Sequence, residues 1–144
     1  MRYLLLLSLA ACSPTRVVVK WWSTGAGTNE RIEIPSSGNG NYTRTDNGRV
    51  EKDERVILTS DQVHELDELF LGQGACQLKH DPEYTPRADE GQTTLELAFP
   101  DQTCKVVLYN TEWDRGHAQP IAETMRSMRP LQRTKPTTRK VNPL

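Results

Sequence analysis

Apolar and polar residues alternate over short stretches in the first half of the chain, which predicts β-strands. Arg16 to Trp22 is β-branched and aromatic, with apolar side chains on both faces, so we expect a strand that is covered on both sides. A second strand is expected over Asn29 to Ile34, where Ile32 and Ile34 share one face. Shorter strands are expected over 42–45, 49–50 and 55–58, with a hairpin turn at 46–48 because Asp-Asn-Gly favours one.

The pattern then changes to the spacing of a helix. Val63, Leu66, Leu69 and Phe70 recur at intervals of three and four residues, and Gly72 ends the run. The segment that precedes them, Thr59-Ser60-Asp61-Gln62, has the spacing of a capping box. We therefore predict a helix over about residues 60–71.

The second half of the chain predicts a hairpin and one more helix. Thr93–Phe99 and Thr103–Tyr109 each alternate and are separated by a short turn, as in a β-hairpin. Ile121, Met125 and Met128 follow Pro120 at helical spacing, and proline is favoured in the first turn of a helix. The polar segment 73–92 predicts a long loop. The order of elements predicts an α+β fold: a small antiparallel sheet with two helices packed on one face.

The N-terminus has the layout of a secretory signal peptide: the positive charge of Arg2, then an apolar run, then small residues. Leu9-Ala10-Ala11-Cys12 resembles the lipobox of bacterial lipoproteins, which implies cleavage before Cys12 and acylation of Cys12. The alternative is an ordinary signal peptide with a chance cysteine. We predict a signal peptide over 1–11, a lipidated tether over 12–15, one domain over 16–130 and a disordered basic tail over 131–144.

The resemblance also implies a location. Two or three acyl chains on Cys12 would hold the protein at a membrane, where a single chain binds only marginally. Ser13, next to it, resembles lipoproteins that are sorted to the outer membrane, if the host is Gram-negative. The expected location is therefore the cell envelope, with the domain on the exported, periplasmic or outer side. No apolar run is long enough for a spanning helix.

The charge and cysteine content limit the classes of partner and of site that we expect. The formal net charge is −1, and loss of Arg2 with the signal peptide would make it −2, so no overall basicity points to nucleic acid. Besides Cys12, only Cys76 and Cys104 remain, and two cysteines in an exported chain predict one disulfide. A metal site is the rival interpretation. It would need ligands from three histidines that lack the spacing of a zinc site: His64, His80 and His117.

The search for catalytic chemistry finds no familiar motif: no nucleophile elbow, no zinc-protease helix, no phosphate loop and no dinucleotide loop. No cofactor is therefore expected. Tryptophans are enriched at binding hot spots. Alternation favours Trp21 as a core residue and leaves Trp22 and Trp113 as binding candidates, since Trp113 lies among polar residues.

The middle and end of the chain resemble, in pattern, emfourin-like small exported domains that inhibit thermolysin-type metalloproteases. The matching stretches are Trp22 to Gly27, Leu58 to Phe70, and Thr93 to Tyr109 followed by Pro120. The resemblance implies that the 23–29 loop, with Gly25 and Gly27, could act as an extended wedge in a protease. No inhibitory residue can be carried over from that family.

Together these observations predict a non-enzymatic, membrane-tethered domain that binds a protein or another envelope component. The alternatives are an inhibitor of a secreted protease, a hydrolase in which His80 or His117 meets a carboxylate or hydroxyl, and a purely structural lipoprotein. The tail over 131–144 has four basic and no acidic residues. It is either a solvated end or a segment that contacts anionic lipid or peptidoglycan.

Overall fold

The computed structural model describes residues 18–25 and 27–129. The predicted signal peptide, Cys12 with its tether, and the basic tail all lie outside the described residues. Ten elements follow one another along the described chain: β1 (Val18–Thr24), β2 (Thr28–Ile34), β3 (Asn39–Asp46), β4 (Arg49–Ile57), α1 (Ser60–Gly72), the 3₁₀ turn η1 (Ala75–Gln77), β5 (Gln92–Ala98), β6 (Thr103–Tyr109), the 3₁₀ turn η2 (Glu112–Asp114) and α2 (Ala118–Ser127).

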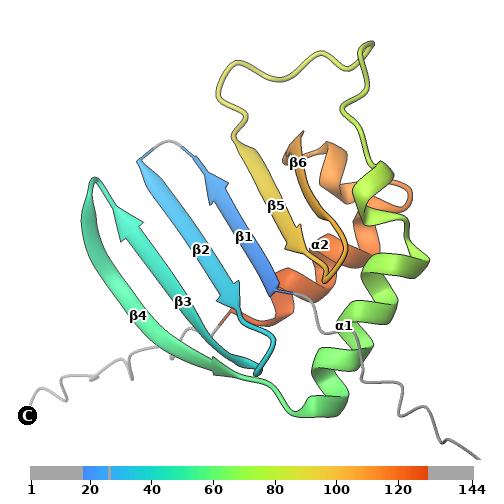
Figure 1. The fold of residues 1–144 in the computed structure, drawn as a ribbon. Coiled ribbons are helices and arrows are strands. Elements are labelled where there is room, and N and C mark those ends of the chain that lie inside the picture. The colour runs from blue at the N-terminus through green and yellow to red at the C-terminus, as the bar shows by residue number, and fades with distance from the viewer. Residues whose placement is uncertain (1–17, 26, 130–144) are drawn as a thin grey trace, which may run out of the picture.

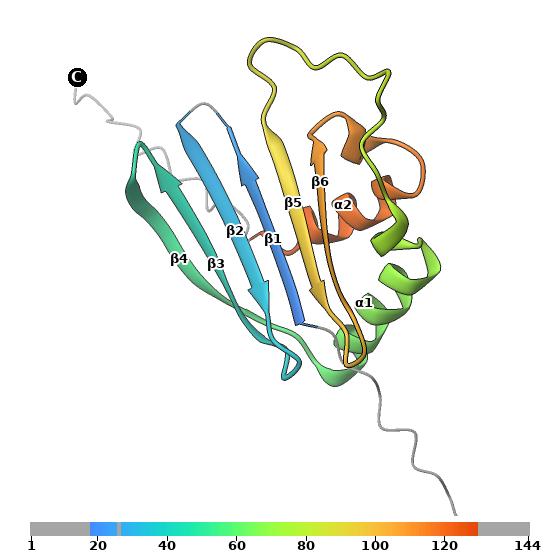
Figure 2. The same ribbon diagram turned by 45° about the horizontal axis from the view of Figure 1, so that its top comes forward.

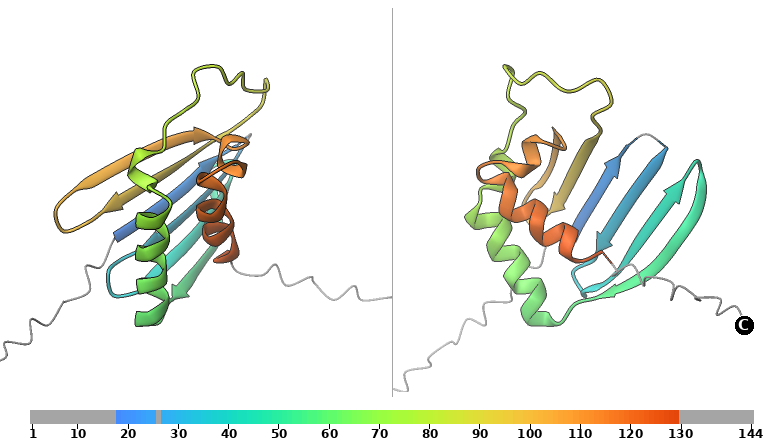
Figure 3. Two further views of the ribbon diagram at one scale, coloured as in Figure 1. Left: turned by 90° about the vertical axis from the view of Figure 1, so that its right-hand side faces the viewer. Right: turned by 180° about the vertical axis from the view of Figure 1, so that it is seen from behind.

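The six strands form one antiparallel sheet in the order β4-β3-β2-β1-β5-β6 (Figure 1). The strand β1 therefore lies inside the sheet, between β2 and β5. Both helices pack on one face of the sheet, and in the right-hand view of Figure 3 α2 crosses that face with α1 beside it. The predicted α+β architecture is confirmed.

The core lies between this face and the helices. Every second residue of the central strands points into it, as Val19, Trp21, Leu95 and Leu97 do, each exposing 2% of its surface or less. The helices contribute an apolar stripe at helical spacing. Its buried members are Val63, Leu66 and Phe70 from α1, and Ala118, Ile121, Ala122 and Met125 from α2.

The helix α1 begins as predicted. The side chain of Thr59 accepts a hydrogen bond from the backbone N–H of Gln62, and the side chain of Gln62 accepts one from the backbone N–H of Thr59. Its acidic residues are not all exposed: Glu65 and Glu68 are, whereas Asp67 is only 4% exposed.

The disulfide between Cys76 and Cys104 is present, as predicted, with the two Cα atoms 5.6 Å apart. It joins η1 to β6 and so ties the end of the α1 segment to the edge of the sheet. Beyond η1, the long loop over 78–91 arches above the sheet before it enters β5 (Figure 2).

Two strand predictions need correction. The region that was expected to hold two short strands, 49–50 and 55–58, is one nine-residue strand, β4. It follows the predicted turn, in which Asn47 and Gly48 both adopt positive φ angles of 46° and 79°. The first strand is covered by helices on one side only within the described chain. Its other side, with Val18, Lys20 and Trp22, belongs to an open face of the sheet.

Candidate binding face

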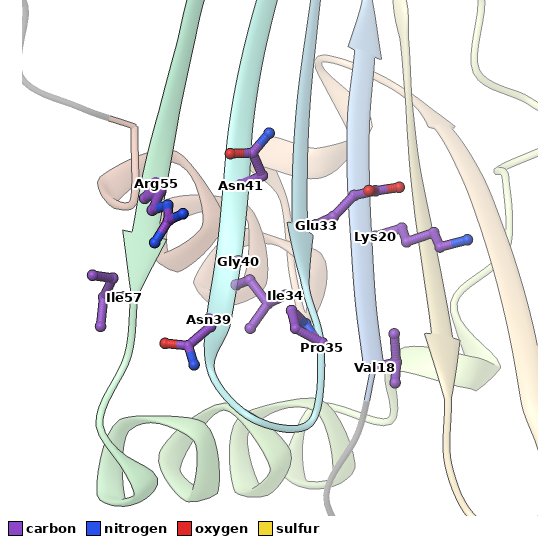
Figure 4. Close-up of a pocket in the computed structure, with 10 residues that line it drawn as sticks. All are labelled: Val18, Lys20, Glu33, Ile34, Pro35, Asn39, Gly40, Asn41, Arg55 and Ile57. Atoms are coloured by element: carbon purple, nitrogen blue, oxygen red, sulfur yellow. The ribbon is translucent and has the colours of Figure 1, made fainter.

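The face of the sheet opposite the helices carries polar and charged side chains in rows that run across the strands. The strand register places Lys105, Glu96, Lys20, Glu33, Asn41 and Arg55 side by side in one row, from β6 to β4. Part of this row appears in Figure 4, in front of the strands, with the helices behind. We call this surface the open face.

The charges in this row alternate in sign over its first four positions. Lys105 lies 3.6 Å from Glu96, measured between Nζ and Oε1. Glu33 forms an ion pair with Arg31, two residues earlier on β2. Each pair of opposite charges on neighbouring strands stabilises a sheet by roughly 0.2–1 kcal/mol. The open face is therefore a surface whose charges largely compensate one another.

A second row runs parallel to the first and is centred on Trp22. Its members are Val107, Thr94, Trp22, Arg31, Thr43 and Asp53. The indole of Trp22 is partly buried, and Lys105 Nζ lies 5.6 Å from the centre of its ring. Since β5 separates β1 from β6, the two side chains meet over β5. Trp22 thus presents an aromatic surface within a polar row.

A third row, Thr24, Asn29, Thr45 and Val50, lies next to the β1–β2 turn. Its members Thr24, Asn29 and Thr45 line a depression of about 810 Å³ together with Trp22, Arg31 and Thr43. A second depression, of about 610 Å³, lies lower on the same face and is drawn in Figure 4. A third depression, of about 550 Å³, lies beside Lys20, Glu96 and Lys105. The open face is therefore hollowed at three places, one beside the aromatic ring and two beside Lys20.

The four predicted binding residues have different places in the fold. Trp22 lies on the open face. Trp113 does not lie on the surface: it is 0% exposed, its Nε1–H donates to the Thr93 carbonyl oxygen at 2.9 Å, and its ring meets that of Trp21 edge to face at 4.8 Å. The prediction of Trp113 as a contact residue is wrong. The 3₁₀ turn η2 rotates the indole into the core, while its neighbours in sequence stay polar.

Gly25 and Gly27 belong to a tight connection between β1 and β2. Thr24 is still paired with Asn29, and the Gly25 N–H donates to the Thr28 carbonyl oxygen at 3.0 Å. Gly27 has a φ of 80°, and a Cβ there would come within 2.8 Å of Asn47 Oδ1. The expected extended wedge is thus reduced to a short hairpin turn, in which Gly27 has a conformational reason to be glycine.

The long loop is fixed by two carboxylates. Glu112, 8% exposed, accepts hydrogen bonds from the backbone N–H groups of Asp81 and Tyr109 at 2.8 and 2.9 Å, and both of its oxygens lie 2.9 Å from His80 Nδ1. Burial raises the pKa of Glu112, but the bonds from Asp81, His80 and Tyr109 outweigh burial and leave the pKa below its ordinary value.

Glu90 anchors the other end of the same loop. It accepts hydrogen bonds from the backbone N–H of Thr111 at 2.8 Å, the Tyr84 hydroxyl at 2.5 Å and the backbone N–H of Arg87 at 3.1 Å. The bonds from Thr111 and Tyr84 lower the pKa of Glu90 to about 2. Both carboxylates therefore act as acceptors that hold the loop against β6 and η2.

The histidines lie apart. His80 contacts Glu112 in this anchored loop, His64 pairs with Glu68 on α1 at 3.1 Å, and His117 Nδ1 lies 3.1 Å from the side-chain oxygen of Gln73. Within residues 18–25 and 27–129, no three histidine, cysteine or acidic side chains are grouped so that they could hold a metal ion. No helix in the described part of the chain has the length and apolar character needed to cross a membrane.

Comparison with the models of known protein families finds no matching family, and comparison with curated proteins finds no significant match. The open face was not identified from the sequence. Its signal was present in the polar members of the alternating strands, but only the register brings residues of different strands, such as Lys20 and Glu96, into one row.

Proposed function

We propose that the protein is an exported, lipid-anchored domain of the bacterial cell envelope that binds a partner or ligand on the open face of its sheet. The observation that carries this proposal is the uneven covering of the sheet. Two helices bury one face, whereas the other face, within the described chain, holds partly buried side chains around Trp22 and three depressions. A sheet face that is hollowed and contains an aromatic ring is suited to binding.

The disulfide supports the exported location. Disulfides form and persist in oxidising compartments and are rare in the cytosol of mesophiles. The bond between Cys76 and Cys104 is compatible with a chain that has passed the membrane through the predicted signal peptide. The anchor itself rests on the resemblance of Leu9-Ala10-Ala11-Cys12 to a lipobox.

The anchor is tested by the variant Cys12→Ala in the native cell. We expect the wild-type protein to take up labelled palmitate and to sediment with membranes, and the variant to do neither. If the variant still sediments with membranes and the wild type takes up no palmitate, the lipid anchor is wrong.

The binding face is tested by site-specific crosslinking. A photoreactive amino acid is placed at Thr43, on the open face, or at Glu68, on the exposed side of α1. We expect envelope components, whether protein or glycan, to be crosslinked from position 43 and not from position 68. Crosslinking from position 68 alone would assign binding to the helical side instead.

A further inference from the structure

The geometry points to a ligand class for the open face: an extended, uncharged polysaccharide whose sugar rings stack on Trp22. This inference rests on the proposed function, because it names the ligand of the same face. Three properties of the open face carry it: compensated charges, an aromatic platform at Trp22, and hydroxyl and amide groups around it.

The charges disfavour an ionic partner. The face carries cations at Lys20, Arg31, Arg55 and Lys105 and anions at Glu33, Asp53 and Glu96, so neither sign dominates. Three of these groups already bind others: Glu96 holds Lys105, Glu33 holds Arg31, and Asp53 accepts from Asn41 Nδ2 at 2.8 Å. A polyanion or polycation gains most from a surface of one sign. Here a polycation would have to break an existing contact at each of the three anions, and a polyanion would have to break one at two of the four cations.

The composition also differs from that of a protein interface. The centre of a protein interface is usually apolar and depleted in charged residues. On the open face the centre is the row Glu96, Lys20, Glu33. Most large apolar residues of the strands point to the opposite side, where Trp21, Ile32 and Leu95 are buried under the helices. The exposed apolar residues of the open face lie on its two edge strands: Val50 and Ile57 on β4, and Val107 on β6.

Trp22 supplies what a sugar ring requires. The face of an indole is apolar and flat, and the axial C–H groups of a pyranose form a flat apolar patch of similar size. Around Trp22, the depression is lined by Thr24, Asn29, Thr43 and Thr45, whose side chains can both donate and accept, and also by charged residues: Glu30, Arg31, Glu33 and Glu96. Sugar hydroxyls also donate and accept, so they can form hydrogen bonds with these neutral side chains.

The rows give the direction of the chain. Trp22 and Thr43 stand in one row on β1 and β3, two strand spacings apart, which is roughly 10 Å. This distance is close to the length of a disaccharide unit. A polysaccharide lying across the strands would therefore place one ring on Trp22, the next over Arg31 and the one after it over Thr43.

Tryptophan fluorescence tests the inference. The chain has three tryptophans, and Trp21 and Trp113 are buried at 1% and 0% exposure, so a surface ligand would act on Trp22. The mature chain, in a detergent without a sugar headgroup, is titrated with oligomers of N-acetylglucosamine, by fluorescence and by calorimetry. We expect saturable binding that salt does not abolish, because the oligomer carries no charge.

Variants separate stacking from folding. Trp22→Thr should weaken binding roughly tenfold or more, whereas Trp22→Tyr should retain most of it because the flat ring remains. Thr43→Val removes one hydroxyl without a change of shape and should weaken binding about three- to tenfold. Leu71→Ala, which removes a side chain 59% exposed on α1, is the control and should leave affinity unchanged.

Several results would overturn the inference. They are the absence of binding at millimolar oligomer, undiminished binding by Trp22→Thr, or a clear preference for heparin or polylysine that disappears with salt. These results would not touch the proposed function: crosslinking of an envelope protein from position 43 would keep the binding face and replace its ligand. Failure of both experiments would remove the face as well.

Discussion

Replacement of Glu112 by glutamine should loosen the long loop and destabilise the domain. The carboxylate accepts from two backbone N–H groups, those of Asp81 and Tyr109, and from the ring of His80. Glutamine has the same shape but only one accepting oxygen, and its NH₂ group would face a second donor. One backbone N–H is then left without an acceptor, at a site where Glu112 is only 8% exposed.

An unpaired buried donor costs about 1–3 kcal/mol. We therefore expect Glu112→Gln to lower the free energy of unfolding by about 2 kcal/mol. The control is Glu123→Gln on α2, whose exposed carboxylate accepts from the side chain of Gln119. A surface change of this kind should stay within about 0.5 kcal/mol.

The assay is urea unfolding followed by circular dichroism, together with hydrogen exchange of the Asp81 and Tyr109 amides. Both amides should exchange faster in Glu112→Gln than in the control. The pH dependence gives a second measurement. Because the folded state holds the pKa of Glu112 below its ordinary value of 4.5, its contribution is present above pH 4.5 and is lost as pH falls through the lowered pKa. The variant should lack this part of the acid dependence. Equal stability of the two variants at pH 7 would refute the assigned role of Glu112.

Three other predictions follow from the core and the loop. The double variant Cys76→Ser/Cys104→Ser opens a loop of 28 residues and should lose about 3.5 kcal/mol in urea unfolding, with no further loss on reduction; an unchanged midpoint would contradict it. Trp113→Phe removes a fully buried indole N–H and part of the core, and should cost about 2–4 kcal/mol by the same assay, whereas a surface tryptophan would lose almost nothing. Since the pKa of Glu90 is held at about 2, wild-type stability should fall as pH drops from about 4.5 to 2, and Glu90→Gln should flatten this decline; parallel pH profiles of the two proteins would oppose it.

The elements that the sequence predicted well are those fixed by residues close to one another in the chain. The first helix was expected over 60–71 and spans Ser60–Gly72, because its start depends on Thr59 and Gln62 alone. The hairpin was expected over 93–99 and 103–109 and forms over Gln92–Ala98 and Thr103–Tyr109 for the same reason. The disulfide was predicted from the number of cysteines, because only Cys76 and Cys104 remain when Cys12 is assigned to the lipid anchor.

The features that were missed depend on contacts between distant segments. The strand β4 contains Lys52-Asp53-Glu54, which offers no apolar alternation, and it forms because β3 pairs with it along its length. Trp113 has polar neighbours in sequence, but its ring packs against Trp21 of β1 and its N–H donates to the carbonyl oxygen of Thr93 in β5. The local sequence gives no sign of the role of Glu112, because its partners Asp81 and His80 come from a loop about thirty residues earlier.

The open face and the proposed anchor constrain each other through the first strand. Val18 begins β1, six residues after Cys12, and six residues reach at most roughly 20 Å. With the proposed lipid anchor at Cys12, the end of the sheet at which β1 starts is therefore the end near the membrane. Trp22 lies four residues further along, roughly 13 Å higher up the strand. The rows of the open face run across the strands, so with β1 standing upright they lie parallel to the membrane. A polysaccharide layer that extends along a membrane would then run parallel to these rows. The depression beside Trp22 is lined by residues of four neighbouring strands in this direction: β5, β1, β2 and β3.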